Sequence, residues 1–297
     1  MSPYLTLLRP PQWIKNVFVF AALVFGGKLG DTSAIVLSLY AFAAFCMASS
    51  AGYILNDILD RERDRLHPKK KERPIASGKV KPGAALALMV LLIAGVGFIS
   101  FGLLHAKFAL AVFGYLGLTI AYSLALKHRV ILDVIVIAML FVIRALGGAF
   151  ALEVDPSAWL LVCTFLLCLF LCFGKRRCEI AMLGDAKDQR KHRATLEDYT
   201  PNLLTHLLST SGGIAIITFL LYTMDTSYPS PFDHVRKQNL MYTLPLVAYG
   251  IYRYAMLIEL GKATGPTDLI IKDPPFVISI LLWIGLAGWI LYGGAPV

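Results

Sequence analysis

Long apolar segments alternate with short polar connections along the whole chain. Most of these segments are close to the roughly 20 residues that a helix needs to cross the hydrocarbon core of a bilayer. Because only helices and closed barrels satisfy the backbone there, the pattern predicts an all-α polytopic membrane protein with nine transmembrane helices. The expected spans are 13–29, 34–56, 84–104, 107–125, 131–152, 157–174, 203–223, 239–258 and 275–293.

The composition agrees with this pattern. Of the 297 residues, 57% are hydrophobic, and the mean hydropathy is +0.67, which excludes an ordinary soluble domain. We expect a single transmembrane domain over residues 1–297. The first span follows Arg9, Pro10 and Pro11 and has no small-residue cleavage site, so it is expected to be retained rather than removed as a signal peptide.

Basic residues gather in alternate connections, namely those after the second, fourth and sixth expected spans. The opposite connections hold only Lys28, Lys107, Arg236 and Lys237. The positive-inside rule places the basic connections and the amino terminus in the cytoplasm and, with nine spans, the carboxyl terminus outside. The net charge of +9 either follows from this bias or gathers an anionic substrate. The basic connections hold Arg61, Arg63, Arg65, Lys69, Lys70, Lys71, Arg73, Lys79 and Lys81, then Lys127 and Arg129, then Lys175, Arg176, Arg177, Lys187, Arg190, Lys191 and Arg193.

The connection after the second span holds a regular set of acids. Asp57, Asp60 and Asp64 lie at positions i, i+3 and i+7, so their carboxylates share one face if the helix continues through them, and Asn56 borders that face. Carboxylates held together repel one another unless a cation lies among them. Hard oxygen ligands of this kind suit Mg²⁺ that is shared with a substrate phosphate.

A run of bases, Lys69 to Lys71 and then Arg73, follows the acids closely. These bases suit the rest of a polyphosphate, so the stretch predicts a magnesium and diphosphate site at the membrane surface, with Asn56, Asp57, Asp60 and Asp64 as metal ligands. A solvated loop surface is the alternative reading of mixed acids and bases.

Other polar residues lie near the same cytoplasmic end. Lys15 and Asn16 enter the first span there, and we expect them to contact an anion. The alternative for Lys15 is that its side chain extends towards the lipid headgroups. Lys127 lies in a short loop and Asp133 begins the fifth span, which draws both towards the acids. Arg144 lies roughly 16 Å further along that helix. A guanidinium at this depth is a functional candidate, and a structural ion pair is the alternative.

The sixth span runs into the sequence GKRRCEIAMLGDAKDQRKHRATLEDYT. Lys175 and Glu179 form an i, i+4 pair, which predicts that the helix continues into the cytosol. The bases at 175–177 are also typical of a positive-inside stop. The loose spacing of Glu179, Asp185 and Asp188 supports a second metal site only weakly. The cysteines show no metal-ligand spacing and are interpreted as packing residues: Cys46, Cys163, Cys168, Cys172 and Cys178.

Nine spans with an NDxxDxxxD motif after the second resemble the UbiA superfamily of intramembrane prenyltransferases over essentially the whole chain. The resemblance implies a central cavity that opens to the cytoplasm and a Mg²⁺-bound diphosphate at the acids. Within the superfamily the chain is more similar to the decaprenyl-phosphate phosphoribosyltransferase branch. The matching segments are RPxQWxKN at 9–16, HPxKxxRPIASG at 67–78, YSxxLK at 122–127, Asp133 with Arg144, KRRxE at 175–179, RxxLExYT at 193–200, and Lys272 with Asp273.

This branch implies an enzyme of the inner or plasma membrane that moves 5-phosphoribose from 5-phosphoribosyl 1-diphosphate (PRPP) to a polyprenyl phosphate and releases pyrophosphate. The product would supply arabinose donors for cell-wall synthesis. The active site would face the cytoplasm, no nucleic acid would be a partner, and a homo-oligomer stays open. The implied catalytic residues are Asp57, Asp60, Asp64, Lys127 and Asp133, and the implied substrate-binding residues are Lys15, Asn16, Lys70, Arg73, Tyr122, Arg144, Lys175, Arg176, Arg177 and Glu179.

Two rival functions use parts of the same pattern. A prenyltransferase with an isoprenoid diphosphate donor would use the same acids, but a typical aromatic prenyltransferase has a second DxxxD motif after the sixth span. Asp185 and Asp188 are only three positions apart, which weakens that reading. A transporter of anionic lipid would bind phosphate through the bases, yet it has little use for three acids in register. The sequence contains no Walker loop, no dinucleotide-binding fingerprint and no nucleic-acid-binding module.

Overall fold

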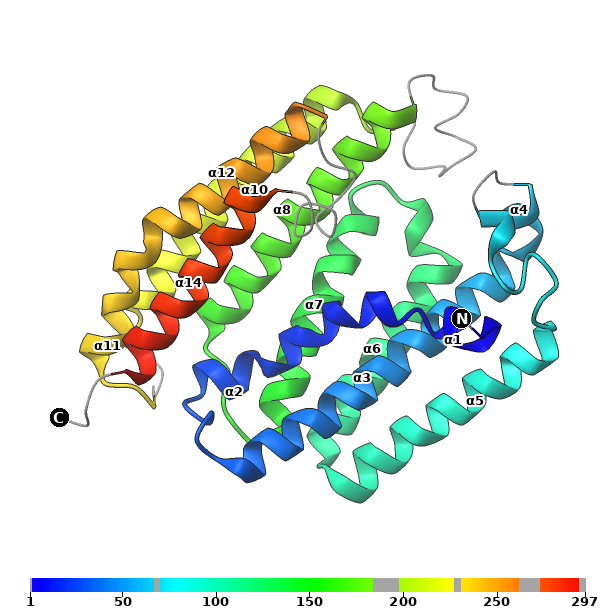
Figure 1. Ribbon diagram of the computed structural model, residues 1–297, viewed down its shortest axis with the longest axis horizontal. Coiled ribbons are helices and arrows are strands. Elements are labelled where there is room, and N and C mark those ends of the chain that lie inside the picture. The colour runs from blue at the N-terminus through cyan, green and yellow to red at the C-terminus, as the bar shows by residue number, and fades with distance from the viewer. Residues whose placement is uncertain (1, 67–69, 184–197, 227–230, 262–272, 294–297) are drawn as a thin grey trace. The chain divides into compact units, whose positions relative to one another are not determined.

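Helices joined by turns and loops make up the part of the chain that the computed structural model describes, which is residues 2–66, 70–183, 198–226, 231–261 and 273–293 (Figure 1). No strand occurs among these residues. Seven of their helices are long and apolar enough to cross a membrane. These are α3 (Thr32–Leu59), α5 (Pro82–Phe98) with its π-helical end η3 (Ile99–Leu103), α6 (Ala106–Leu124), α7 (Leu132–Ala151), α8 (Ala158–Leu183), α10 (Pro201–Met224) and α14 (Pro274–Tyr292).

Seven of the nine expected spans therefore appear as long helices, and the other two are helical but shorter. The first expected span is a 3-10 helix, η1 (Pro10–Phe20), followed by α2 (Ala21–Phe25). The eighth is η6 (Leu240–Thr243) followed by α12 (Leu244–Glu259). Both η1 and α12 have proline in their first turn. Proline has no N–H to donate to a preceding turn, so it is tolerated at the start of a helix but not in its interior. The count of nine is not confirmed.

The acid motif lies at the end of α3, where the structure differs slightly from the expected continuous helix. Leu59 ends α3, Asp60 forms a turn, and the short α4 (Arg61–Arg65) follows at once. The amide N–H of Asp60 bonds to the carbonyl of Asn56, and that of Asp64 to the carbonyl of Asp60. Helical bonding thus survives across the turn, so the three acids keep nearly helical spacing.

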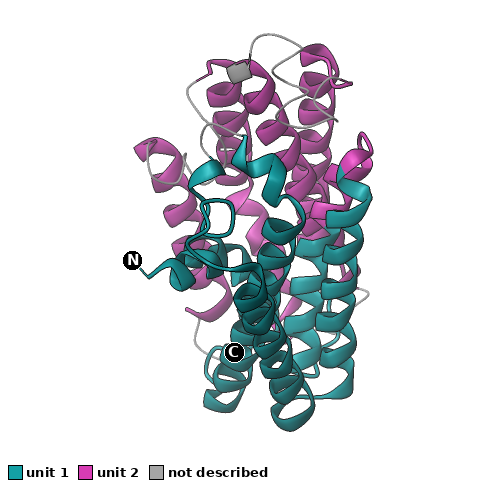
Figure 2. Ribbon diagram, turned by 90° about the vertical axis from the view of Figure 1, so that its right-hand side faces the viewer, with its two compact units in different colours: residues 1–127, 139–156 teal, residues 128–138, 157–297 magenta. Residues whose placement is uncertain are grey.

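The chain divides into two compact units (Figure 2). Unit 1 comprises residues 1–127 and 139–156, and unit 2 comprises residues 128–138 and 157–297. Unit 1 also contains α1 (Pro3–Leu8), η2 (Lys70–Glu72) and η4 (Leu126–His128, up to Lys127), and unit 2 contains α11 (His234–Asn239). The expectation of one domain over the whole chain stays a prediction.

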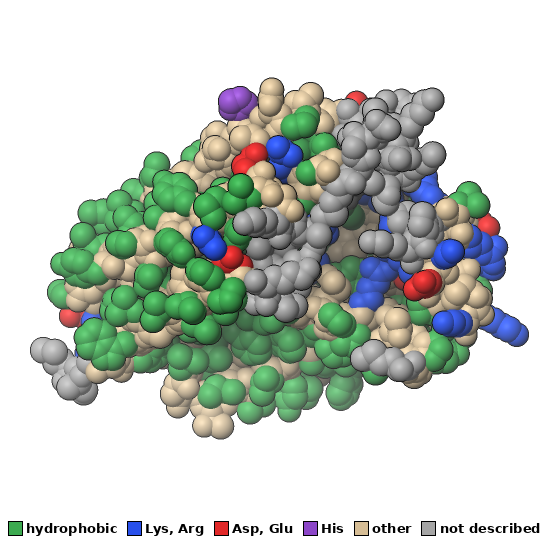
Figure 3. All heavy atoms as spheres, turned by 45° about the horizontal axis from the view of Figure 1, so that its top comes forward, with side chains coloured by type: hydrophobic (Ala, Val, Ile, Leu, Met, Phe, Trp, Pro, Cys, Tyr) green, Lys and Arg blue, Asp and Glu red, His purple; other side chains and the backbone are tan. Residues whose placement is uncertain are grey.

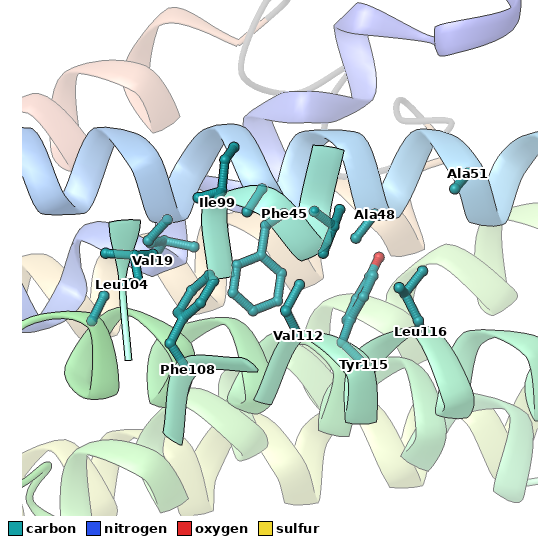
Figure 4. Close-up of a cluster of buried hydrophobic side chains, with 14 of the residues drawn as sticks. Val19, Phe45, Ala48, Ala51, Ile99, Leu104, Phe108, Val112, Tyr115 and Leu116 are labelled. Carbon is teal, nitrogen blue, oxygen red and sulfur yellow. The ribbon is translucent and has the colours of Figure 1, made fainter. Parts of the chain in front are cut away.

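In unit 1, α3 packs against α5 and α6. Phe45 of α3 meets the rings of Phe108 and Tyr115 of α6 edge-on, with centroids 5.8 and 5.5 Å away (Figure 4). Small residues such as Ala48 and Ala51 let the helices approach closely beside these rings. This packing holds α3 in place, and the last turn of α3 carries the first acids of the motif.

In unit 2, α8 packs against α10, and α12 packs against α14, with Phe170 and Tyr254 within the same core. Gly174 allows one close contact, because a Cβ at this position would lie 2.6 Å from the Tyr254 hydroxyl oxygen. That hydroxyl donates to the carbonyl of Leu171 over 3.0 Å. The contact fixes the part of α8 directly before Lys175.

Large hydrophobic side chains also cover much of the visible surface (Figure 3). Leu91, Phe101, Leu110 and Trp289 are all mostly exposed to the surroundings of the protein. Water disfavours so much exposed apolar surface, whereas lipid tails accept it. These faces fit helices that lie in a membrane.

Candidate active site

Two of the predicted metal ligands meet on a single arginine. Asp57 and Asp64 are seven residues apart, which places them only about 20° apart around a helix. Arg73 donates from Nη1 to Asp57 Oδ1 over 3.1 Å and to Asp64 Oδ2 over 2.6 Å. Both acids are buried, with exposed fractions of 2% and 3%. Because one nitrogen reaches both carboxylates, the two acids lie side by side.

Arg9 is a second base on Asp57. Its Nη2 donates to Asp57 Oδ1 over 2.5 Å, and its guanidinium lies 5.0 Å from the centre of the Tyr53 ring. Arg9 separates α1 from η1 and has a left-handed backbone with φ 54°, which costs a residue other than glycine about 1–3 kcal/mol. Arg9 was not predicted as a site residue, and its position in the RPxQWxKN segment is the only sign in the sequence that points to the site.

Asp60 has a different partner from the other two acids. It lies about 60° around the helix from Asp57 and pairs with Lys127, whose Nζ lies 3.0 and 3.1 Å from the two carboxylate oxygens. Lys127 also donates to Asn56 Oδ1 over 3.3 Å. The short loop of η4 thus brings Lys127 to the acid motif, as the sequence indicated, and its catalytic role stays a prediction.

The acid motif fits Mg²⁺ by its donor chemistry. Asp57, Asp60, Asp64 and Asn56 all offer hard oxygen atoms, and two of the carboxylates already lie together. Among the described residues, however, no three histidine, cysteine, aspartate or glutamate side chains converge on one point. Arg73 holds the place between Asp57 and Asp64, so a cation that binds both must move this guanidinium.

Arg144 lies deep in unit 1 and is almost fully buried. Its Nε donates to Asn16 Oδ1 over 2.7 Å, its Nη1 to the Leu140 carbonyl over 2.9 Å, and its Nη2 to the Tyr115 hydroxyl over 2.8 Å. Its carbon Cζ also lies 4.6 Å from the centre of the Tyr115 ring. These partners are all neutral, so a structural ion pair does not account for Arg144 among the described residues.

The Asn16 side chain extends this network to α3. It is fully buried, and its Nδ2 donates to Ser49 Oγ over 3.3 Å. Arg144 and Asn16 together therefore hold η1 against α3, α6 and α7, and with it the neighbouring Lys15. These contacts favour a positioning role, while direct substrate binding by Asn16 or Arg144 stays a prediction.

A second polar cluster lies in unit 2 around Asp133, the second residue of α7. Asp133 is fully buried and accepts a bond of 3.1 Å from Arg176 Nε. Arg176 also donates from Nη1 to Glu179 on the next turn of α8. The Tyr199 hydroxyl donates to Asp133 Oδ1 over 2.8 Å. We call Asp133, Arg176, Glu179 and Tyr199 the Asp133 cluster.

Tyr199 was not predicted as a site residue, and it has a further contact at the start of α7. Its oxygen accepts a bond of 2.6 Å from the amide N–H of Ile131, which has a left-handed backbone with φ 66°. Such a backbone is strained in a β-branched residue, so Tyr199 helps to hold the start of α7. Burial, together with the Asp133 carboxylate, raises the pKa of the Tyr199 hydroxyl, which therefore stays protonated. Its place in the RxxLExYT segment was the only sign in the sequence that Tyr199 belongs to a polar cluster.

The other predicted binding residues are spread over both units. Lys175 lies 3.9 Å from Glu179 on α8, which continues to Leu183 as expected. Arg177 donates to Glu259 of α12 over 3.3 Å. Lys15 on η1, Lys70 on η2 and Tyr122 on α6 are partly exposed, and their binding roles stay predictions. Asp185, Asp188 and Lys272 lie outside the described residues.

Comparison with known proteins agrees with these observations. The UbiA prenyltransferase family profile matches residues 16–272. This chain belongs to the UbiA family. It is therefore a transferase and an integral membrane protein, and the resemblance read from the NDxxDxxxD motif is confirmed.

Several relatives over most of the chain are named decaprenyl-phosphate phosphoribosyltransferase, and others carry the names of different UbiA proteins, such as protoheme IX farnesyltransferase. A decaprenyl-phosphate phosphoribosyltransferase of Mycolicibacterium smegmatis is 32% identical, over 98% of this chain and 93% of that protein. Another of Corynebacterium glutamicum is 31% identical, over 93% of this chain and 83% of that protein. A UbiA homologue from Archaeoglobus fulgidus, solved with GPP and Mg²⁺ bound, has a TM-score of 0.73 at 20% identity and covers 98% of this chain and 99% of its own. This likeness shows the UbiA fold.

Proposed function

We propose that this UbiA enzyme transfers 5-phosphoribose from PRPP to a polyprenyl phosphate and releases pyrophosphate. Full-length similarity to proteins named decaprenyl-phosphate phosphoribosyltransferase carries the choice of donor and acceptor. The three acids beside Arg9, Arg73 and Lys127 support it, because a diphosphate needs both a cation and basic groups. The product would be a lipid-linked phosphoribose of the kind that feeds arabinose donors for cell-wall polymers.

Asp57, Asp60 and Asp64, with Asn56, would hold Mg²⁺ at the diphosphate of the donor. When bound, Mg²⁺ neutralises the diphosphate and stabilises it as a leaving group. Arg73 and Lys127 contact these same acids, so they are close enough to bind the oxygens of the diphosphate. Arg suits phosphate especially well because its planar fork makes two parallel hydrogen bonds.

The reaction exchanges one bond at the anomeric carbon of the ribose. An oxygen of the lipid phosphate forms a bond to this carbon as the bond from the carbon to the diphosphate oxygen breaks, and pyrophosphate leaves. Positive charge develops on the ribose ring meanwhile, and the fixed carboxylates stabilise it. The lipid phosphate is already an anion and needs no general base, so positioning and charge neutralisation supply most of the rate gain.

The bases outside the acid motif would bind the remaining phosphates. Lys15 and Lys70 in unit 1, and Lys175 in unit 2, are cations with exposed surface that would contact the 5-phosphate or the lipid phosphate. The excess of lysine and arginine near the acids supports a site that faces the cytoplasm, in a protein with nine spans and a cavity open to that side.

Mass spectrometry of the lipid product tests the proposal. Purified protein would be incubated with Mg²⁺, PRPP and a mixed pool of polyprenyl phosphates, and we expect lipids that have gained one phosphoribosyl group. Asp60→Ala should lower this transfer by roughly 100-fold or more, because it removes a carboxylate from the diphosphate site. Asp155→Ala, which removes an exposed acid outside the acid motif, is the matched control.

Two results would contradict the proposal. One is undiminished transfer by Asp60→Ala in a folded protein. The other is an unchanged polyprenyl phosphate pool with PRPP, together with prenylated product when an isoprenoid diphosphate and an aromatic acceptor are supplied. The second result would assign the chain to the prenyltransferases of the UbiA family.

A further inference from the structure

The ion pairs of the acid motif point to a property beyond the transfer reaction. We infer that Arg9 and Arg73 are internal counterions of Asp57 and Asp64, and that a divalent cation and a diphosphate therefore bind the motif cooperatively. The inference rests on the proposed diphosphate site, but it requires neither a particular sugar nor a particular lipid.

The contacts show that the two guanidiniums take the same carboxylates that a cation needs. Arg73 Nη1 lies 3.1 Å from Asp57 Oδ1 and 2.6 Å from Asp64 Oδ2, and Arg9 Nη2 lies 2.5 Å from the same Asp57 oxygen. These two acids therefore have their negative charge compensated by side chains of unit 1. A cation that coordinates them must displace at least Arg73.

Burial indicates which partners of these ion pairs can move. The side chains of Asp57 and Asp64 are 2% and 4% exposed, whereas those of Arg9 and Arg73 are 25% and 24% exposed. The acids are held on α3 and α4 inside unit 1, whereas the arginine side chains that reach them are partly exposed. The arginines can therefore turn outward while the carboxylates stay in place.

Charge explains why the two ligands would help each other. A cation that binds alone must break the arginine contacts and leave two guanidiniums beside it, and like charges at this distance repel strongly. A diphosphate that binds alone must compete with the carboxylates for the same guanidiniums. When both bind, the cation takes the carboxylates and the diphosphate takes the arginines, whose forked geometry suits phosphate oxygens. Such coupling is reciprocal, so each ligand tightens the binding of the other.

Mn²⁺ binding to the full-length protein in detergent tests this exchange. Free Mn²⁺ would be measured by electron paramagnetic resonance, with and without inorganic pyrophosphate, for the wild type and Arg73→Gln. We expect Mn²⁺ alone to bind Arg73→Gln roughly tenfold more tightly than the wild type, which lies within the range usual for coupled sites. We also expect pyrophosphate to tighten Mn²⁺ binding by a smaller factor in Arg73→Gln, because one of the two exchanged counterions is gone.

Arg63→Gln is the matched control. Arg63 lies on α4 close to Asp64, is exposed, and loses the same charge on substitution. A general electrostatic effect would tighten Mn²⁺ binding equally in both variants, whereas counterion exchange predicts a change of less than about twofold in Arg63→Gln, because exposed charges are screened.

Equal Mn²⁺ affinity in Arg73→Gln and Arg63→Gln would overturn the inference, as would weaker binding by Arg73→Gln. Should Arg73→Gln fail to fold, Arg9→Gln tests the same exchange at Asp57. Absence of Mn²⁺ binding in the wild type even with pyrophosphate present would overturn both the inference and the proposed diphosphate site. Tighter binding by Arg73→Gln supports the inference even if the donor is not PRPP, because no sugar or lipid enters the measurement.

Discussion

The acid motif of unit 1 and the Asp133 cluster of unit 2 use the same pair of residue types in different surroundings. In each, an arginine binds a buried aspartate, Arg73 on Asp64 and Arg176 on Asp133. The Arg73 side chain is 24% exposed, but that of Arg176 is only 3% exposed. Partly exposed arginine can exchange its partner for a ligand, whereas buried arginine cannot without leaving a charge inside the protein.

The two clusters therefore suit different tasks. The acid motif has partners that can leave, which fits ligand binding. Asp133 is held from two sides by Arg176 and Tyr199, and Tyr199 also holds the strained backbone at Ile131. This arrangement fits a structural role that keeps the start of α7 in register with α8. Glu179 is the more exposed member of the cluster, and the exposed Lys175 lies beside it.

The largest expected difference comes from making the same substitution in both clusters. Arg176→Gln should lower the free energy of unfolding by about 3–5 kcal/mol, because it leaves Asp133 buried without its cation. Arg73→Gln should also be destabilised, but Mg²⁺ should restore it by binding Asp57 and Asp64 in the folded state only. Thermal unfolding in detergent, with Mg²⁺ and with a chelator, checks this. If Mg²⁺ restored Arg176→Gln equally, the contrast would be wrong.

Tyr199→Phe should have an intermediate effect. It removes the bond donated to Asp133 and the oxygen that accepts from Ile131, at a cost of about 1–3 kcal/mol. Because the pKa of Tyr199 is raised in the folded state, its contribution is fully present below the unfolded pKa of about 10 and is lost only at higher pH.

The difference in melting temperature between the wild type and Tyr199→Phe should therefore stay constant between about pH 6 and pH 9. A difference that changed across this window would show that another group titrates with Tyr199. Tyr222→Phe, which removes a buried hydroxyl elsewhere in unit 2, is the control for loss of a phenol.

Lys175→Gln should have the smallest effect on stability. Its pair with Glu179 spans 3.9 Å and its side chain is half exposed, so the change in unfolding free energy should stay within about 0.5 kcal/mol. If Lys175 binds a substrate phosphate, KM for that substrate should rise several-fold while the melting temperature stays the same. An unchanged KM would show that Lys175 does not bind that substrate and would leave only its contribution to the positive-inside bias.

The parts of the fold that depend on local pattern could be predicted from the sequence. Apolar runs marked the seven long helices, and the spacing of Asp57 and Asp64 correctly placed them together. Lys175 and Glu179 correctly predicted the extension of α8. The 3-10 form of η1 was not predicted, because two prolines exclude an ordinary helix start without specifying the replacement.

The site was predictable only where its residues are neighbours in the chain. Arg9 reaches Asp57 across 48 residues, and Tyr199 reaches Asp133 across 66. Periodicity reports which face of a helix a residue lies on, but not which distant side chain meets it. Arg73 was expected to bind phosphate, and its present contact with both acids could not be read from a charge pattern.

The surroundings of Arg144 also bear on how the protein is made. A guanidinium in the middle of a span disfavours insertion of that helix by about 2.5–3.5 kcal/mol. Its side-chain partners, Asn16 and Tyr115, lie 128 and 29 residues earlier in the chain. The ribosome therefore delivers both to the membrane before α7 emerges. Arg144 therefore does not depend on any later segment of the chain for these two partners.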